Sequence, residues 1–268
     1  MPKQNSNPLS RFSLASHELR KRIIAASAGE VGTGKTRFWM TAPGPIVVFS
    51  LDMGTEGVVE EFRQDGKEIY VQEYEWAPPP VAEDTSYEEK EEFKEQAQSI
   101  RNRFLEDFEI AVQNARTVVW DKESDIWEMF RYAEFGAPND APKNYAALNQ
   151  RYRRAVNLPK SFDVNFGLIR GLKDKWGTRM KRSGNGTQPF NTGEREVVGF
   201  SELDGLVHTT LFHRREEGKF LIDVGKSRGP GGQAIQDQTL EAMSSGLGLT
   251  FSELAQLVFP ETDDGDWV

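Results

Sequence analysis

The residues best suited to chemistry form one glycine-rich run near the start of the chain. Residues 29–36 read Gly-Glu-Val-Gly-Thr-Gly-Lys-Thr and match the pattern G-x-x-x-x-G-K-[ST] in full. Such a loop turns backbone N–H groups toward phosphate oxygens, and the helix that follows adds its positive end. We therefore expect the chain to bind and hydrolyse ATP or a closely related nucleoside triphosphate. The predicted nucleotide-binding residues are Gly29, Glu30, Val31, Gly32, Thr33, Gly34, Lys35, Thr36 and Arg37.

Three side chains complete the expected phosphate chemistry. Lys35 should reach the β- and γ-phosphates, and the Thr36 hydroxyl should ligate Mg²⁺. Residues 117–120 are β-branched or apolar and end at Asp121, so they resemble a strand that delivers a carboxylate to the water shell of the metal. We assign Mg²⁺ to Thr36 and Asp121, and to Lys35 the catalytic role of holding the phosphates.

Carboxylates also follow the apolar run 46–51, which ends where a strand of the sheet would end. Ligands of doubly wound folds bind at that edge, so Asp52 or Glu56 could orient the attacking water as a general base, with Glu56 slightly preferred. Glu123 is a third candidate. The alternative is that Asp52 and Glu56 serve only the turn and the next helix.

Two cations stand two positions apart in the glycine-flanked run 225–229. Lys226 and Arg228 could neutralise charge on the γ-phosphate, including that of a neighbouring subunit. Surface loops also carry Lys and Arg for solubility alone, so the local sequence leaves both interpretations open.

Net charge by itself argues against a nucleic-acid partner, because the chain has 42 acidic and 33 basic residues. The distribution changes that interpretation. Residues 143–182 hold eleven basic residues against two acidic ones, and the acidity lies elsewhere, notably in 83–95 and 263–266. A local basic surface able to bind a polyanion is therefore compatible with the sequence.

The absence of cysteine excludes disulfides and thiolate metal sites and favours a reducing compartment, and none of the three histidines has the spacing of a zinc site. The first ten residues lack the apolar stretch of a secretory signal, and no apolar run is long enough to span a bilayer. We expect a soluble cytoplasmic protein without membrane contact.

Periodicity predicts an α/β protein with a mainly parallel central sheet. A β-hairpin is predicted around the Glu217-Gly218 turn, and residues 177–193 are interpreted as a mobile loop because they are rich in Gly, Ser, Asn and Thr. We divide the chain into a flexible leader (1–20), a core (21–232) and a C-terminal helical segment with an acidic tail (233–268). Predicted strands are 22–27, 46–51, 68–74, 117–121, 164–172, 207–214 and 219–224, and predicted helices are 87–114, 124–135, 145–156, 235–243 and 251–258, the last capped by Thr250.

The order of these parts resembles a RecA-like P-loop ATPase core, and most closely the short phage ATPases of that class that assist single-strand annealing and recombination. The resemblance spans roughly residues 20–232, and its specific part is 29–36. The other matching pieces are the acid-bearing run 46–56, the strand 118–121, the strand 164–170 with the basic loop after it, and the hairpin that leads to 226–228.

The resemblance implies that the loop at 176–193 contacts single-stranded DNA. Arg179, Lys181 and Arg182 would meet phosphates, and Trp176 and Phe190 are stacking candidates, which is what a sequence-tolerant strand binder needs. It also implies that the cations at 226 and 228 act across a subunit interface of a homo-oligomer. Two departures stand out: Lys122-Glu123 follows Asp121 where a small hydroxyl residue is usual, and no Gln stands near Arg170.

The resulting hypothesis is a Mg²⁺-dependent ATPase that acts on single-stranded DNA in phage-type recombination, annealing or repair, in the cytoplasm of a bacterial host. A single-strand DNA-binding protein is a further partner that such a role allows. The alternatives are a DNA-packaging or helicase-loading ATPase, a small-molecule kinase, and a non-hydrolysing module in which nucleotide is structural.

Overall fold

The computed structural model describes residues 20–51, 54–76, 85–136, 145–180, 187–241 and 248–267. The predicted leader lies outside these residues except for Arg20. Asp52, Lys181 and Arg182 also lie outside them, as does the side chain of Glu56.

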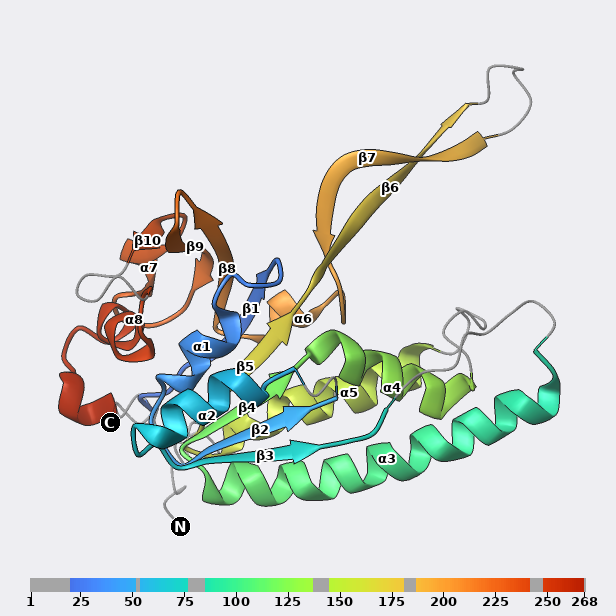
Figure 1. Cartoon of the computed structure of the whole chain (residues 1–268), viewed down its shortest axis with the longest axis horizontal. Coiled ribbons are helices and arrows are strands. Elements are labelled where there is room, and N and C mark those ends of the chain that lie inside the picture. Colours follow the sequence, from blue (N-terminus) through green and yellow to red (C-terminus); the bar gives the residue numbers. More distant parts are fainter. Residues whose placement is uncertain are drawn as a thin grey trace, which may run out of the picture.

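A single eight-stranded sheet forms the centre of the molecule, in the order β10-β9-β8-β1-β5-β4-β2-β3 (Figure 1). The strands from β8 to β3 all run parallel to their neighbours, and β9 and β10 continue the sheet as antiparallel strands. The α/β class with a mainly parallel sheet is therefore confirmed. The strands are β1 (Ile24–Gly29), β2 (Ile46–Ser50), β3 (Ile69–Glu73), β4 (Thr117–Asp121), β5 (Asn165–Arg170), β8 (Thr209–Glu216), β9 (Lys219–Ser227) and β10 (Thr239–Glu241).

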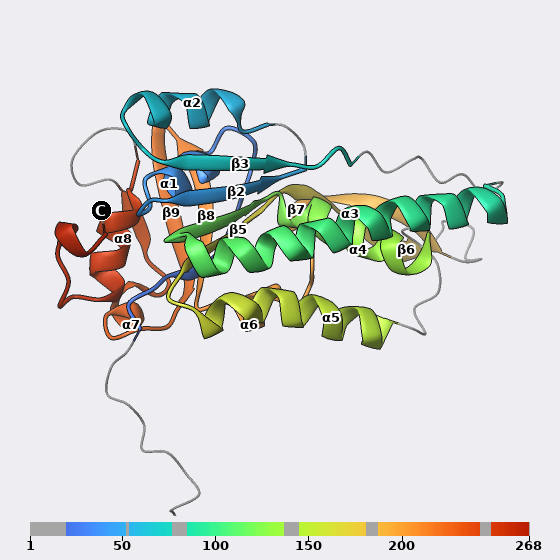
Figure 2. The same ribbon diagram turned by 90° about the horizontal axis from the view of Figure 1, so that it is seen from below.

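Helices cover both faces of the sheet because neighbouring residues of the buried strands point to opposite faces. Val119 packs in the cluster that contains Phe38 and Phe251, whereas Val118 and Trp120 pack in the cluster that contains Phe104. The first face is covered by α1 (Lys35–Met40), α2 (Glu56–Gln64) and α8 (Phe251–Val258), and the second by α3 (Tyr87–Asn114), α4 (Glu123–Phe135) and α5 (Tyr145–Asn157), as Figure 2 shows.

Local signals set the ends of two of these helices. Ser86 accepts a hydrogen bond from the Glu89 N–H, and the Glu89 carboxylate accepts one from the Ser86 N–H, which is a complete capping box at the start of α3. Thr250 and Glu253 form the same arrangement at α8, so the predicted cap is confirmed. The Glu217-Gly218 turn also has the positive φ angles of a tight hairpin.

The prediction of a mobile loop at 177–193 is wrong over the described part of that range. β6 (Leu172–Met180) and β7 (Thr187–Val197) pair antiparallel in a separate two-stranded sheet, which projects from the body of the molecule (Figure 1). Gly177 lies opposite Phe190, where a Cβ would come within 3.0 Å of the Phe190 ring. The glycine here makes room for an aromatic side chain across the ladder, and does not mark a break in structure.

The predicted helix at 235–243 is also wrong over its described part, 235–241. α7 (Gly232–Ile235) ends where that helix was expected to begin, and β10 pairs with β9. Asp237 has a φ of 61° and its N–H donates to the Val224 carbonyl at 2.7 Å, so the chain turns onto the sheet edge. Two further helical turns are η3 (Leu158–Ser161) and α6 (Leu203–Leu206).

The C-terminal segment belongs to the same hydrophobic core as the sheet. Phe251 packs against Trp39 of α1, with ring centroids 5.6 Å apart. Trp267, in the short turn η4 (Asp264–Trp267) of the predicted acidic tail, is buried against Phe251 and Phe259. Residues 248–267 therefore stabilise the face of the sheet that carries α1.

Candidate functional site

The glycine-rich run connects β1 to α1 through a tight turn. β1 ends at Gly29 and α1 begins at Lys35, as the motif requires. Gly29, Gly32 and Gly34 have φ angles of 153°, 77° and 84°, which L-residues with a Cβ rarely adopt. A Cβ on Gly29 would also lie 2.3 Å from the carbonyl oxygen of His213 on β8. The backbone curl thus depends on glycine at these positions.

Lys35, the lysine predicted to contact phosphates, folds back over this turn. The Lys35 ammonium donates to the carbonyl oxygens of Gly29 at 2.9 Å and Glu30 at 2.6 Å. Burial lowers the pKa of Lys35, and the nearby Asp121 carboxylate opposes that shift. Lys35 therefore lies at the mouth of the loop with backbone oxygens as partners, which phosphate oxygens could replace.

The two predicted metal ligands meet. The Thr36 hydroxyl donates to Asp121 Oδ2 at 2.7 Å, although 85 residues separate them in the chain. β4 carries Asp121 to the same sheet edge as the loop, and its side chain is nearly buried. A hydroxyl and a carboxylate are ligands that Mg²⁺ prefers, and phosphates and water supply the rest in nucleotide sites. No cluster of three or more His, Asp or Glu side chains suited to a metal occurs in the described residues.

A cavity of about 870 Å³ opens beside the loop, a volume typical of small-molecule sites. Its walls come from the loop, from α1, from the start of α4 and from both roots of the β6–β7 hairpin. Lining residues from these elements include Lys35, Thr36, Asp121, Trp127, Arg170 and Val198.

The general base remains a prediction. Asp52 and the side chain of Glu56 lie outside the described residues; the backbone of Glu56 begins α2. Glu123 begins α4, two residues after Asp121, but its side chain is fully buried and does not line the cavity. A base must approach the attacking water closely, so the position of Glu123 does not suit that role.

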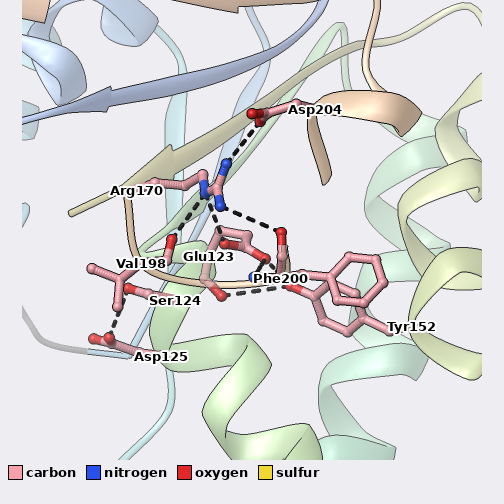
Figure 3. A network of polar contacts seen from close by, with 8 residues as sticks. All are labelled: Glu123, Ser124, Asp125, Tyr152, Arg170, Val198, Phe200 and Asp204. Atoms are coloured by element: carbon pink, nitrogen blue, oxygen red, sulfur yellow. Dashed lines mark hydrogen bonds and ion pairs between the residues drawn. The ribbon is translucent and has the colours of Figure 1, made fainter. Parts of the chain in front are cut away.

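Glu123 instead belongs to a buried polar network that joins the cavity to the hairpin (Figure 3). Its Oε1 accepts hydrogen bonds from the Tyr152 hydroxyl at 2.7 Å and the Phe200 N–H at 3.2 Å, and Oε2 lies 3.5 Å from Arg170 Nε. Arg170 ends β5 and also pairs with Asp204 at 2.8 Å. We call Glu123, Tyr152, Arg170 and Asp204 the Glu123–Arg170 network.

Arg170 holds the returning strand of the hairpin. Its Nε donates to the Val198 carbonyl at 2.9 Å and its NH2 to the Phe200 carbonyl at 3.3 Å (Figure 3). A Cβ on Gly199 would lie 2.0 Å from Glu123 Oε2, so glycine is required between these two carbonyls. The sequence signal for this network is Arg170 itself, a charged residue at the end of an otherwise apolar strand.

Burial raises the pKa of Glu123 to about 7, while Arg170, the Tyr152 hydroxyl and the Phe200 N–H act in the opposite direction. Arg170 is only 5% exposed. Glu123 and Arg170 are thus both buried away from water, and the attraction between them offsets part of the free-energy cost of desolvating each charge.

The described members of the predicted DNA-binding set lie on the hairpin. Trp176 on β6 is 63% exposed, and the Arg179 guanidinium lies 5.4 Å from the Phe190 ring centroid across the ladder. No carboxylate pairs with Arg179 in the described part of the chain, whereas Lys173 and Lys175 pair with Glu196 and Glu194 of β7. The hairpin therefore presents two aromatic rings and a cation along its length.

Lys226 and Arg228 lie far from the phosphate loop of their own chain. Lys226 of β9 lies opposite Thr210 of β8 in the sheet. The neighbouring Thr209 lies opposite Ala25, near the start of β1, whereas Gly29 is at the end of β1. The Lys226 ammonium donates to the carbonyls of Asp204 at 2.5 Å and Val207 at 2.7 Å. Within one chain these cations cannot serve the phosphates, and a role on a neighbouring subunit stays a prediction.

Basic side chains gather around His208 at the far end of the sheet. The pKa of His208 falls to about 4, chiefly through burial and then through Lys160, Arg22, Arg228 and Lys226. Four basic side chains thus lie near His208, with the carboxylates of Asp163 and Asp204 also close to them.

No protein-family model matches the sequence, and the curated proteins searched contain no match to it. Among the described helices, none is both long enough and apolar enough to cross a membrane.

Proposed function

We propose that the protein is a Mg²⁺-dependent ATPase of the RecA-like class that acts on single-stranded DNA in recombination, annealing or repair. One observation carries the nucleotide part: a glycine-rich turn at the mouth of a parallel strand, with Lys35 over it and Thr36 2.7 Å from a strand-end carboxylate. Three backbone angles in this turn demand glycine, and the adjoining cavity has the volume of a ligand site.

The proposed roles follow from these positions. Backbone N–H groups of residues 29–36 and the start of α1 would hold the phosphates, and Lys35 would exchange its carbonyl partners for the β- and γ-phosphates. Thr36 and Asp121 would hold Mg²⁺, which bridges phosphate oxygens and neutralises charge as the terminal phosphate leaves. Asp52 or Glu56 would orient the attacking water.

The DNA part of the proposal is supported by the projecting hairpin. An exposed tryptophan, a second aromatic ring and an arginine with no carboxylate partner among the described residues suit a strand whose bases stack and whose phosphates attract cations. Lys181 and Arg182, next to β6 in sequence, would add two charges. Because both roots of the hairpin line the nucleotide cavity, strand binding can influence hydrolysis over a short path.

The proposed active form is a homo-oligomer with nucleotide between subunits. Lys226 and Arg228 belong to a group of basic side chains at the end of the sheet opposite the loop, which is where trans-acting cations would have to lie if copies stack head to tail. The protein would work in the cytoplasm, alongside a single-strand DNA-binding protein.

ATP turnover with and without single-stranded DNA, at two salt concentrations, tests this function. We expect DNA to stimulate hydrolysis and added salt to weaken the stimulation steeply, because phosphate contacts release counterions. Absence of MgATP binding would remove the proposal. Hydrolysis that DNA leaves unchanged would favour a packaging or loading ATPase. Phosphoryl transfer to a small acceptor molecule would favour a kinase. Bound ATP that survives hours of incubation with Mg²⁺ would favour a structural nucleotide.

A further inference from the structure

A second cavity lies directly beside the phosphate cavity. It occupies about 190 Å³ between α1, α2, β9 and residues 248–250. Gly34, Arg37 and Phe220 line both cavities, so the two adjoin at the start of α1. A ligand whose phosphates lie on the loop would therefore find the second cavity within reach of its other end.

The smaller cavity has the size and lining of a subsite. Pockets that hold a whole small molecule measure roughly 300–1,000 Å³, so this one has room for only part of a ligand. Its apolar lining comes from four different elements. Polar side chains line it as well, and two of them, Arg37 and Glu61, form a two-pronged ion pair at 2.7 Å. The other polar lining residues are Thr33, Thr41, Asp65, His213 and Thr250. The apolar lining residues are Phe38, Phe62, Phe220, Ile222 and Leu249.

His213 adds an unsatisfied polar atom to this wall. Its side chain is 2% exposed, and its Nε2 has no hydrogen-bond partner among the described residues. Burial, and secondarily the charge of Lys35, lower the pKa of His213 to about 3, so the ring is neutral at physiological pH. A buried polar atom without a partner is unfavourable unless a ligand or water satisfies it.

The opposite end of the phosphate cavity has a different character. There the walls carry charged side chains, including Glu128, Arg131, Lys173 and Arg195, with Trp127 among them. Both cavities carry charged side chains, but the smaller one is lined by three phenylalanine rings and two aliphatic side chains, and His213 Nε2 has no hydrogen-bond partner among the described residues. A flat aromatic group is therefore matched there by three rings, whereas Trp127 is the aromatic side chain at the other end.

We infer that the smaller cavity is the nucleobase subsite of the proposed nucleotide site, with Phe220 as the apolar wall at its entrance and His213 Nε2 as a hydrogen-bond partner for the edge of the base. Phe220 is well placed for this role: a Cβ on Gly34 of the phosphate loop would lie 3.3 Å from its ring. Glycine at 34 thus serves the turn and also admits this ring. The inference rests on the proposed function, because it presupposes that phosphates occupy the loop.

Comparing MgATP with magnesium tripolyphosphate tests the inference, because tripolyphosphate has the phosphates without the base. Titration calorimetry on the wild-type chain should show MgATP binding at least tenfold more tightly. Phe220→Ala should lose about tenfold or more in MgATP affinity, the usual scale of a base–aromatic contact, and keep its affinity for tripolyphosphate. Phe220→Tyr should restore MgATP binding.

The controls separate the possible failures. Tyr87→Ala truncates an exposed aromatic side chain outside both cavities and should leave both affinities unchanged. Retained tripolyphosphate binding by Phe220→Ala shows that the loop is intact. The inference alone would be overturned if the ratio of MgATP affinity to tripolyphosphate affinity were the same in Phe220→Ala and wild type. It would also be overturned if Trp127→Leu, and not Phe220→Ala, selectively lost affinity for MgATP. Failure of the wild type to bind either compound would overturn the proposed function.

A measurement on the unaltered chain tests the histidine. The ¹⁵N chemical shift of His213 Nε2 should change when MgATP is added and stay constant with tripolyphosphate. A shift that is the same with both compounds, or with neither, would contradict the assigned contact to the base.

Discussion

The phosphate loop and the β6–β7 hairpin are built in opposite ways. The loop consists of consecutive residues between β1 and α1, and its three glycines have positive φ angles, with a Cβ on Gly29 also blocked by the His213 carbonyl. The hairpin projects from the body, its strands pair only with each other, and its residues are mostly exposed (Figure 1). The proposed site for a small, highly charged ligand is thus fixed by backbone geometry, whereas the surface proposed for a long polymer is an open ribbon.

The two regions meet at the Glu123–Arg170 network. Glu123 follows the metal-ligand candidate Asp121 by two residues, and Arg170 bonds to carbonyls at the root of β7. A change at the cavity end of α4 can thus reach the hairpin through one buried ion pair. The predictions below separate the contributions of the loop, the network and the hairpin.

Removal of the loop cation should have the largest effect. Lys35→Ala is expected to abolish hydrolysis, by at least about a hundredfold in kcat, because no other cation among the described residues donates to the loop carbonyls. Steady-state ATP turnover measures this. Lys173→Ala, which lines the same cavity but pairs with Glu196, is the matched control and should keep most activity. Normal turnover by Lys35→Ala would remove the site assignment.

Breaking the buried pair should have the largest effect on stability. Arg170→Ala leaves Glu123 buried without its cation, and we expect the free energy of unfolding to fall by about 3–5 kcal/mol. Urea unfolding measures it. Arg153→Ala removes an arginine from an exposed pair with Glu202 and should cost less than about 1 kcal/mol. Equal losses in the two variants would contradict the structural role of the network.

Truncation on the hairpin should weaken DNA binding without affecting basal hydrolysis. Trp176→Ala is expected to lose about 1–3 kcal/mol of binding free energy for single-stranded DNA, the usual contribution of one stacked base. Fluorescence anisotropy with a labelled oligonucleotide measures it. Tyr70→Ala, an exposed aromatic on the edge strand β3, is the control. If both variants bind DNA like the wild type, the hairpin is not the DNA-binding surface.

The smallest effect should be a pH dependence of stability that belongs to Glu123. Its pKa is raised from 4.5 to about 7 in the folded chain, so the folded state binds the proton more tightly than the unfolded state between those values. Stability contributed by this group is therefore present below about pH 4.5 and is lost as pH rises toward 7, by at most about 1.4 kcal/mol for each pH unit.

The variant Glu123→Gln cannot titrate and isolates this contribution. The difference in unfolding free energy between wild type and Glu123→Gln should change across pH 5–7 in favour of the wild type at the acidic end, as urea unfolding at several pH values would report. A difference that stays constant with pH would mean that the Glu123 carboxyl does not titrate in this range.

Residues near one another in the chain determined most of what could be predicted. The loop at 29–36, the helix at 87–114 with its capping box, the Glu217-Gly218 turn and the Thr250 cap all depend on contacts within a few residues, so side-chain type is sufficient to specify them. Short runs of apolar and β-branched residues likewise predicted the buried strands and hence the α/β class.

Tertiary structure decided what depends on partners distant in the chain. Glycine and polar residues at 177–193 suggested a loop, yet pairing across the ladder makes them strands, and residues 239–241 became β10 because the β9 edge was free to accept them. Glu123 and Arg170 are 47 positions apart and meet only because β4 and β5 are neighbours in the sheet. Local propensity determines secondary structure only weakly where the hydrogen bonds or charges of a segment must be satisfied by a distant segment. In those places the tertiary structure determines both the secondary structure and the partners of the charged side chains.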